Sequence, residues 1–292
     1  MPKSQGQAEP ASSRRASVRG RIPLQVILGG IFSGFVVGAV LLSFFWTPWD
    51  PDFSDVSNRL TGPSAEHWFG TDHLGRDLLT VTMLGGQVSL SITLISTAIG
   101  AVLGVLLALG AAGAPPAIGA SLARLADIGI ALPSILIALV LATALGPGSG
   151  SMIIAISVWF VPVTARVLIG PARQVLSLDF IEASRSQGRG QFFILLRHVM
   201  PNIGPLIIVQ ISIMFGAGVL IESSLSFLGV GVQPPIPSWG RILNEAQPLL
   251  SVSPHYLLMP GAVIVLAILG FNLLGDGLRV WLDPQQSRRG TD

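Results

Sequence analysis

Few residues in this chain could carry chemistry, and they are widely spaced. The chain has no cysteine, so thiolate nucleophiles, thiolate metal ligands and disulfides are excluded. Lys3 is its one lysine, and no stretch fits the phosphate-binding pattern G-x-x-x-x-G-K-[ST]. We therefore expect no catalytic residue, no directly bound cofactor and no ATP hydrolysis by this chain. The four histidines do not predict a metal site, because they are scattered at His67, His73, His198 and His255.

One cluster of charged residues lies at 70–77, which reads G-T-D-H-L-G-R-D. Asp72, Arg76 and Asp77 could contact an external partner or could fix the fold of a loop, and we favour the structural role. Gly70 and Gly75 are expected to permit turns.

A second polar segment, 177–190, predicts two short helices across a glycine turn. Ser177 is expected to cap the first helix, with Asp179 in its first turn. Gly188 is expected to end that helix, because glycine accepts the left-handed conformation. The second helix should end at Pro201, where the next apolar stretch begins.

The first of these two helices carries small residues flanked by charges. Ala183 and Ser184 would let another surface approach closely, with Glu182 and Arg185 beside them. An amphipathic loop resting on lipid headgroups explains the same pattern. Physical reasoning alone leaves both readings open.

These polar segments lie between long apolar stretches. Half of the residues are hydrophobic and 11% are charged, whereas a soluble domain carries roughly 25% charged residues. About 20 apolar residues span a bilayer as a helix. Six stretches predict an all-α integral membrane protein: Leu24–Trp46, Val88–Ala112, Leu122–Leu145, Ser151–Ile169, Asn202–Ile221 and Leu257–Gly275. Pro133 and Pro162 are expected to kink the third and fourth.

Arginine placement predicts the orientation. With both termini cytoplasmic, only Arg59, Arg76 and Arg241 fall in outer segments, as the positive-inside rule expects. The expected parts are a cytoplasmic basic tail at 1–23, a first transmembrane helix at 24–46, a structured extracytoplasmic loop at 47–87, a five-helix core at 88–284 and a cytoplasmic tail at 285–292.

Glu222 stands at the outer end of the fifth stretch. A carboxylate within a membrane span is a functional candidate by default, here for a transport pathway. At a helix end it can also simply reach water, and we favour that second reading.

The segment around Glu182 resembles a known family. The E-A-S at 182–184, Gly188, and R-H-V-M-P-N at 197–202 are similar to the E-A-A loop of binding-protein-dependent importer permeases. In that family this loop is a coupling helix that docks on an ATPase subunit. The resemblance implies an ATPase interface at Glu182, Ala183, Ser184, Arg185 and Gly188, with serine replacing the second alanine.

Three further segments resemble the dipeptide/oligopeptide/nickel branch of that family. They are G-T-D-H-L-G-R-D at 70–77, the outer loop at 224–240 that contains Trp239, and the end of the last span at 272–284. Gln87 and Val280 depart from the branch pattern. The match is to the shorter, N-terminally extended permease of a pair, and it implies outer-loop or binding-protein contacts at Asp72, Arg76, Asp77 and Trp239.

The resemblance implies a type I importer fold in the bacterial plasma membrane. The implied partners are a second permease, two ATP-binding subunits that hold ATP and Mg, an extracytoplasmic binding protein and the lipid bilayer, without nucleic acid. The implied function is peptide import by alternating access. The alternative is an ion-gradient-driven secondary transporter, but the span centres are almost free of charge. The substrate could be a dipeptide, a longer peptide, glutathione, a nickel complex or haem.

Overall fold

The computed structural model describes residues 22–282, so most of the predicted tail at 1–23 and all of the tail at 285–292 lie outside it. Within the described range the chain is helical, with one isolated bridge between Thr71 and Asp77. Its α-helices are α1 (Leu24–Leu42), α2 (Leu78–Gly113), α3 (Pro116–Ala131), α4 (Ser134–Leu145), α5 (Ser149–Leu176), α6 (Asp179–Ser186), α7 (Gln191–Ile194), α8 (Met200–Phe227), α9 (Trp239–Ala246) and α10 (His255–Leu282), with short turns η1 (Val56–Asn58), η2 (Leu195–Val199) and η3 (Gln247–Leu249).

Each of the six predicted spans contains helix, although the first helix ends at Leu42 and not at Trp46 as predicted. Five helices, counting α7 to α8 as one, are long and apolar enough to cross a membrane, and the bent pair of α3 and α4 passes the same test only when its two helices are taken together. The two members of that pair meet at 87°. Leu132 is extended at the break because the following Pro133 disfavours a helical conformation there. The kink predicted at Pro133 is confirmed, whereas α5 continues as one helix through Pro162.

The predicted boundary between the outer loop and the second span is wrong. The helix α2 begins at Leu78 and not at Val88, so the loop ends at residue 77. The Asp77 side chain caps the helix by accepting from the amide of Thr80. The first turns of α2 carry polar residues such as Thr80 and Thr82, which face the protein interior and so escape a search for apolar runs.

The second helix of the 177–190 prediction also ends elsewhere. Gln191–Phe227 runs continuously through α7, η2 and α8, so Pro201 does not end a helix. Pro201 stands in the first turn of α8, after the π-helical turn η2. A wider turn before a proline accommodates its missing amide hydrogen.

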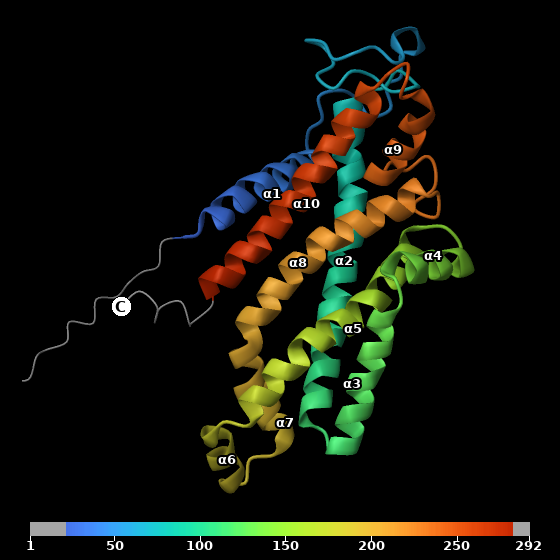
Figure 1. The fold of residues 1–292 in the computed structure, drawn as a ribbon. Helices are drawn as coiled ribbons and strands as arrows, with labels where there is room; N and C mark the ends of the chain where they lie inside the picture. Colours follow the sequence, from blue (N-terminus) through green and yellow to red (C-terminus); the bar gives the residue numbers. More distant parts are fainter. Residues whose placement is uncertain (1–21, 283–292) are drawn as a thin grey trace, which may run out of the picture.

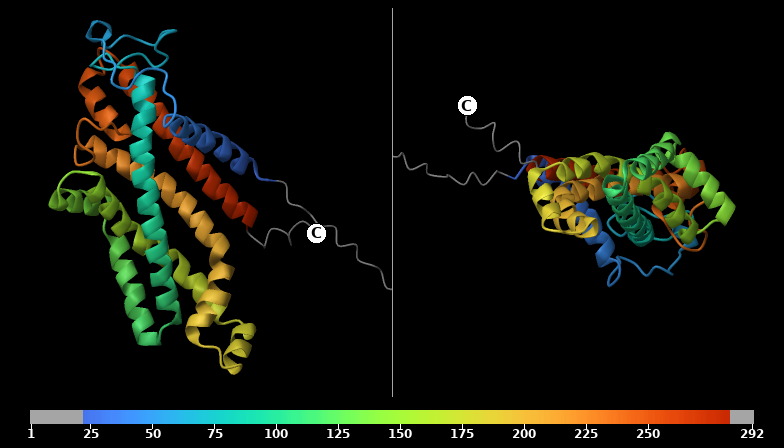
Figure 2. Two further views of the ribbon diagram at one scale, coloured as in Figure 1. Left: turned by 180° about the vertical axis from the view of Figure 1, so that it is seen from behind. Right: turned by 90° about the horizontal axis from the view of Figure 1, so that it is seen from below.

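The helix α2 runs through the middle of the bundle and packs against α3, α5 and α8, while α1 lies along α10 (Figure 1). Residues 43–77 and α9 gather at one end of the molecule. The helix α6 and the α2–α3 turn lie at the opposite end, as both side views show (Figure 2). The two charged segments singled out in the sequence are therefore at opposite ends of the bundle.

Candidate functional site

The helix α6 is attached to the bundle by one buried side. Ile181 is fully buried among Leu109 of α2, Ala172 of α5 and Ile194 of α7. Ser184 Oγ and His198 Nε2 are 3.3 Å apart and hydrogen-bonded. This role of His198 was not predicted, because Ser184 and His198 are 14 positions apart and no local pattern links them.

The opposite side of α6 is open. Glu182, Ala183 and Arg185 are exposed, and Gly188 ends the helix region with φ of +78°, as predicted. Ser184 is a correction, because it is 7% exposed and faces the chain's own interior. Ser177 is a second correction: its hydroxyl donates to the carbonyl of Gln174, and α6 begins after Leu178 without a side-chain cap.

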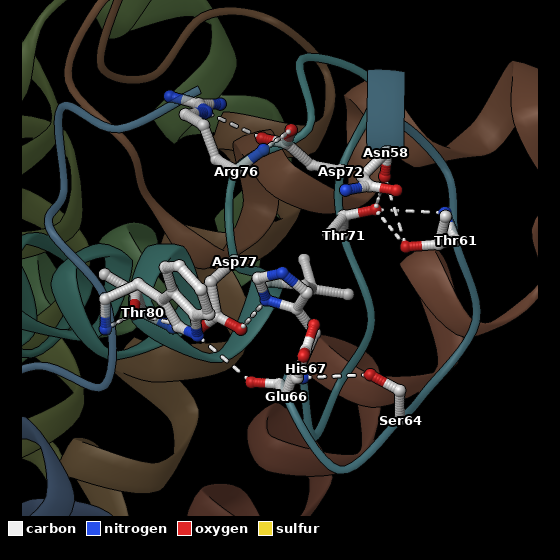
Figure 3. Close-up of polar contacts among 12 residues, drawn as sticks. Asn58, Thr61, Ser64, Glu66, His67, Thr71, Asp72, Arg76, Asp77 and Thr80 are labelled. Carbon is white, nitrogen blue, oxygen red and sulfur yellow. Dashed lines mark hydrogen bonds and ion pairs between the residues drawn. The ribbon is translucent and has the colours of Figure 1, made fainter. Parts of the chain in front are cut away.

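At the other end, Asp72 organises the turn at 70–77 (Figure 3). Its carboxylate is fully buried, and it accepts from the amides of Leu74 and Arg76 at 2.8 and 2.9 Å. The second oxygen pairs with Arg76 Nε at 2.7 Å. Arg76 retains a side-chain exposure of 23%, so it is the member of this pair that reaches the surface.

Asp77 joins the loop to the start of α2. One oxygen accepts from both the amide and the hydroxyl of Thr80 at 2.8 Å. The other lies 2.9 Å from His67 Nδ1 (Figure 3). Trp49 stacks on His67 at 4.6 Å and donates its indole hydrogen to the carbonyl of Glu66. The favoured structural reading of this cluster therefore agrees with its geometry.

Trp239 is buried completely, so its side chain presents no surface to a partner. Its indole nitrogen donates to the carbonyl of Thr82 at 2.9 Å, and its amide donates to Ser89 Oγ at 3.1 Å. These bonds fix the start of α9 against α2.

Glu222 does not reach water, contrary to the favoured sequence interpretation. Its side chain is fully buried in α8. Ser226 Oγ donates to one carboxylate oxygen at 2.8 Å, and Ser223 Oγ donates to the other at 3.4 Å. Ser89, which sequence reasoning did not single out, lies beside the same carboxylate. The cluster lies where α2, α8 and α9 meet.

This geometry defines a class: a multi-pass helical membrane protein with a rigid loop region at one end and an exposed short helix at the other. Residues 68–288 match the family described as binding-protein-dependent transport system inner membrane component. The chain belongs to this family of ABC importer permeases, in its dipeptide/oligopeptide branch, and is a multi-pass protein of the bacterial plasma membrane.

Two individual members of the family are similar to this chain over most of its length. The glutathione transport system permease protein GsiD of Escherichia coli O6:K15:H31 is 39% identical over 255 residues, 86% of this chain and 84% of the relative. GsiD of Pectobacterium atrosepticum is 34% identical over 260 residues, 89% of this chain and 86% of the relative.

A solved structure confirms the type I permease fold. The MetNI methionine ABC transporter in an inward-facing conformation has a chain with a TM-score of 0.53 at 20% identity, covering 69% of this chain and 96% of that chain. Membership of this family implies ATPase and permease partners in a transport system, and it overrules the ion-gradient-driven alternative.

Proposed function

We propose that this chain forms half of the translocation path of an ATP-driven, binding-protein-dependent importer of small peptides. The relatives named above are glutathione permeases, and glutathione is itself a tripeptide. Their identity to this chain extends over most of its length, which supports a substrate of that class. The path alternates between outward and inward access as ATP is bound and hydrolysed on two partner subunits, which hold the ATP and Mg.

The main support for this proposal is that α6 has one exposed side and one buried side. Its exposed side offers Glu182, Ala183 and Arg185 to a partner, while Ile181 on the other side is packed against α2 and α5. A displacement of α6 by a docked ATPase is therefore transmitted to two membrane-spanning helices, since a close-packed core does not deform freely. We assign α6 as the coupling helix, with both termini of the chain on its side of the membrane.

In this proposal the substrate-binding protein docks on the outer end of the permease. Among the predicted contacts there, Arg76 has a partly exposed side chain, whereas Asp72, Asp77 and Trp239 are buried. We propose that Arg76 meets the binding protein and that the buried residues hold it in place. Glu222 is enclosed in this conformation, so we assign it to the packing of α8 against α2 and not to the pathway.

The test uses the whole transporter, with its second permease, ATPases and binding protein, reconstituted in proteoliposomes. Uptake of labelled glutathione and of a neutral tripeptide is measured with and without ATP. We expect ATP-dependent uptake that the charge reversal Glu182→Arg lowers by about tenfold or more, because like-charge contacts at an interface cost several kcal/mol. Asp52→Arg, an exposed charge reversal at the other end, is the control for recovery of the ATPase subunits, which it should leave unchanged.

Two results would count against the proposal in different ways. ATP hydrolysis stimulated by the binding protein without uptake of either peptide would contradict the substrate class alone. Unchanged uptake and unchanged ATPase recovery in the Glu182→Arg transporter would contradict the assignment of α6.

A further inference from the structure

A pocket of about 700 Å³ lies beside the coupling helix, between the α2–α3 turn and the end of α5. Its volume falls within the range of about 300–1,000 Å³ that is usual for small-molecule sites. The part of its lining that matters here consists of Ala111, Pro116, Arg173, Leu176, Arg185 and Gln191. The pocket adjoins the exposed face of α6, and Arg185 contributes to both.

The pocket is positively charged and holds no counter-charge of its own. Arg173 and Arg185 line it, and no acidic side chain does. Arg173 uses Nη2 to reach the carbonyls of Ala111 and Gly119, at 3.3 and 3.4 Å, which holds its guanidinium at the pocket wall. In residues 22–282, Arg185 has neither an ion pair nor a side-chain hydrogen bond, and it is exposed. Two guanidinium groups facing one cavity favour a phosphate-type anion.

The position of the pocket along the membrane-spanning helices indicates the source of that anion. The apolar run of α2 ends at Ala112, at the pocket, and the apolar run of α5 ends at Ile169, four residues before Arg173 of the pocket lining. Helices pass from hydrocarbon to headgroups where their apolar runs end. The pocket therefore lies at the level of lipid phosphates, and its alanine, proline and leucine walls suit a glycerol backbone.

Two exposed apolar side chains lie next to lining residues in the sequence. Phe192 directly follows Gln191 of the lining and is 76% exposed. Leu178, at the start of α6, is 43% exposed. Exposed aromatic and aliphatic side chains beside arginines form the composition of surfaces that rest in a membrane interface.

We propose that this pocket binds the phosphate headgroup of an anionic phospholipid from the leaflet on the α6 side, with Arg173 and Arg185 as its cationic partners. Basic pockets between transmembrane helices are general sites for such headgroups. Because Arg185 belongs to α6 and Arg173 to α5, one bound lipid bridges the coupling helix to a membrane span. The position of α6 then depends on the lipid composition of the membrane.

The test measures lipid binding directly and does not depend on transport. The purified, delipidated permease is titrated with phosphatidylglycerol or phosphatidylcholine in detergent, and bound lipid is counted by native mass spectrometry. We expect tighter binding of phosphatidylglycerol, and a loss of about fivefold in its affinity in Arg185→Gln, the effect of one arginine near a membrane surface. Arg189→Gln, in the same loop but outside the pocket, is the matched control and should bind as the parent does.

Three results would overturn the proposal. Equal losses in Arg185→Gln and Arg189→Gln would show general surface attraction without a site. Displacement of the lipid by millimolar inorganic phosphate would show that a free anion is the occupant. Unchanged phosphatidylglycerol affinity in Arg185→Gln would show that this arginine does not bind the lipid.

Discussion

The two ends of this permease use similar residues in opposite ways. At the outer end Asp72 and Asp77 face inward, where both are buried and hydrogen-bonded several times each. At the α6 end the charged residues face outward, and one buried isoleucine with one serine–histidine contact holds the helix. A buried charged side chain with all its hydrogen bonds made holds the surrounding loop in one conformation. An exposed charged side chain without a partner in its own chain is available to bind another molecule.

The largest effect is expected from Asp72→Ala. This change leaves the amides of Leu74 and Arg76 without an acceptor and the Arg76 guanidinium without its ion pair. We expect the free energy of unfolding to fall by about 3–4 kcal/mol, measured as a lower unfolding temperature of the purified protein. Asp52→Ala, an exposed change in the same loop, is the control. Equal stability of the two variants would show that the outer loop is not held by Asp72.

Two glycines with nearly the same φ differ in what surrounds them, one at each end of the bundle. Gly75 has φ of +77° and Gly188 has φ of +78°. A side chain at Gly75 would collide with the backbone of Asp55, whereas at Gly188 it would meet open space. We expect a loss of about 2–4 kcal/mol for Gly75→Ala and about 1 kcal/mol for Gly188→Ala, compared by the unfolding of both variants. The reverse order would contradict the packed outer end and the open α6 end.

A smaller effect is expected from Trp239→Phe. The phenyl ring keeps most of the buried apolar area but cannot donate to the carbonyl of Thr82. We expect a loss of about 1–2 kcal/mol in the free energy of unfolding. If Trp239 were instead a contact for the binding protein, stability would be unchanged and only the affinity for that protein would fall. Measuring both quantities on one preparation separates the two roles.

Much of the fold is predictable from the sequence because a bilayer demands long apolar helices. The six spans and the break at Pro133 follow from composition and from proline stereochemistry. The start of α2 is not predictable in this way, because the polar side chains of Thr80 and Thr82 are satisfied by the protein and not by water. An apolar run indicates the part of a helix that crosses the membrane, and the helix itself can be longer.

The site is less predictable than the fold. The glycine stop at Gly188 and the exposure of Glu182 follow from local pattern. The burial of Ser184, Trp239 and Glu222 does not, since it results from contacts with residues far along the chain or on the next helix. The local sequence pattern identifies polar residues that stand out from their apolar surroundings. Tertiary packing determines whether their side chains are buried or exposed.

The most direct test of the coupling assignment uses the absence of cysteine from this chain. Ala183→Cys on α6 and Asp52→Cys in the outer loop are each labelled with a benzophenone maleimide in the assembled transporter and illuminated. We expect position 183 to be joined to an ATPase subunit, with a yield that changes when ATP is added, and position 52 not to be joined. No ATPase adduct at 183, or equal adducts at both positions, would contradict the assignment of α6 as the coupling helix.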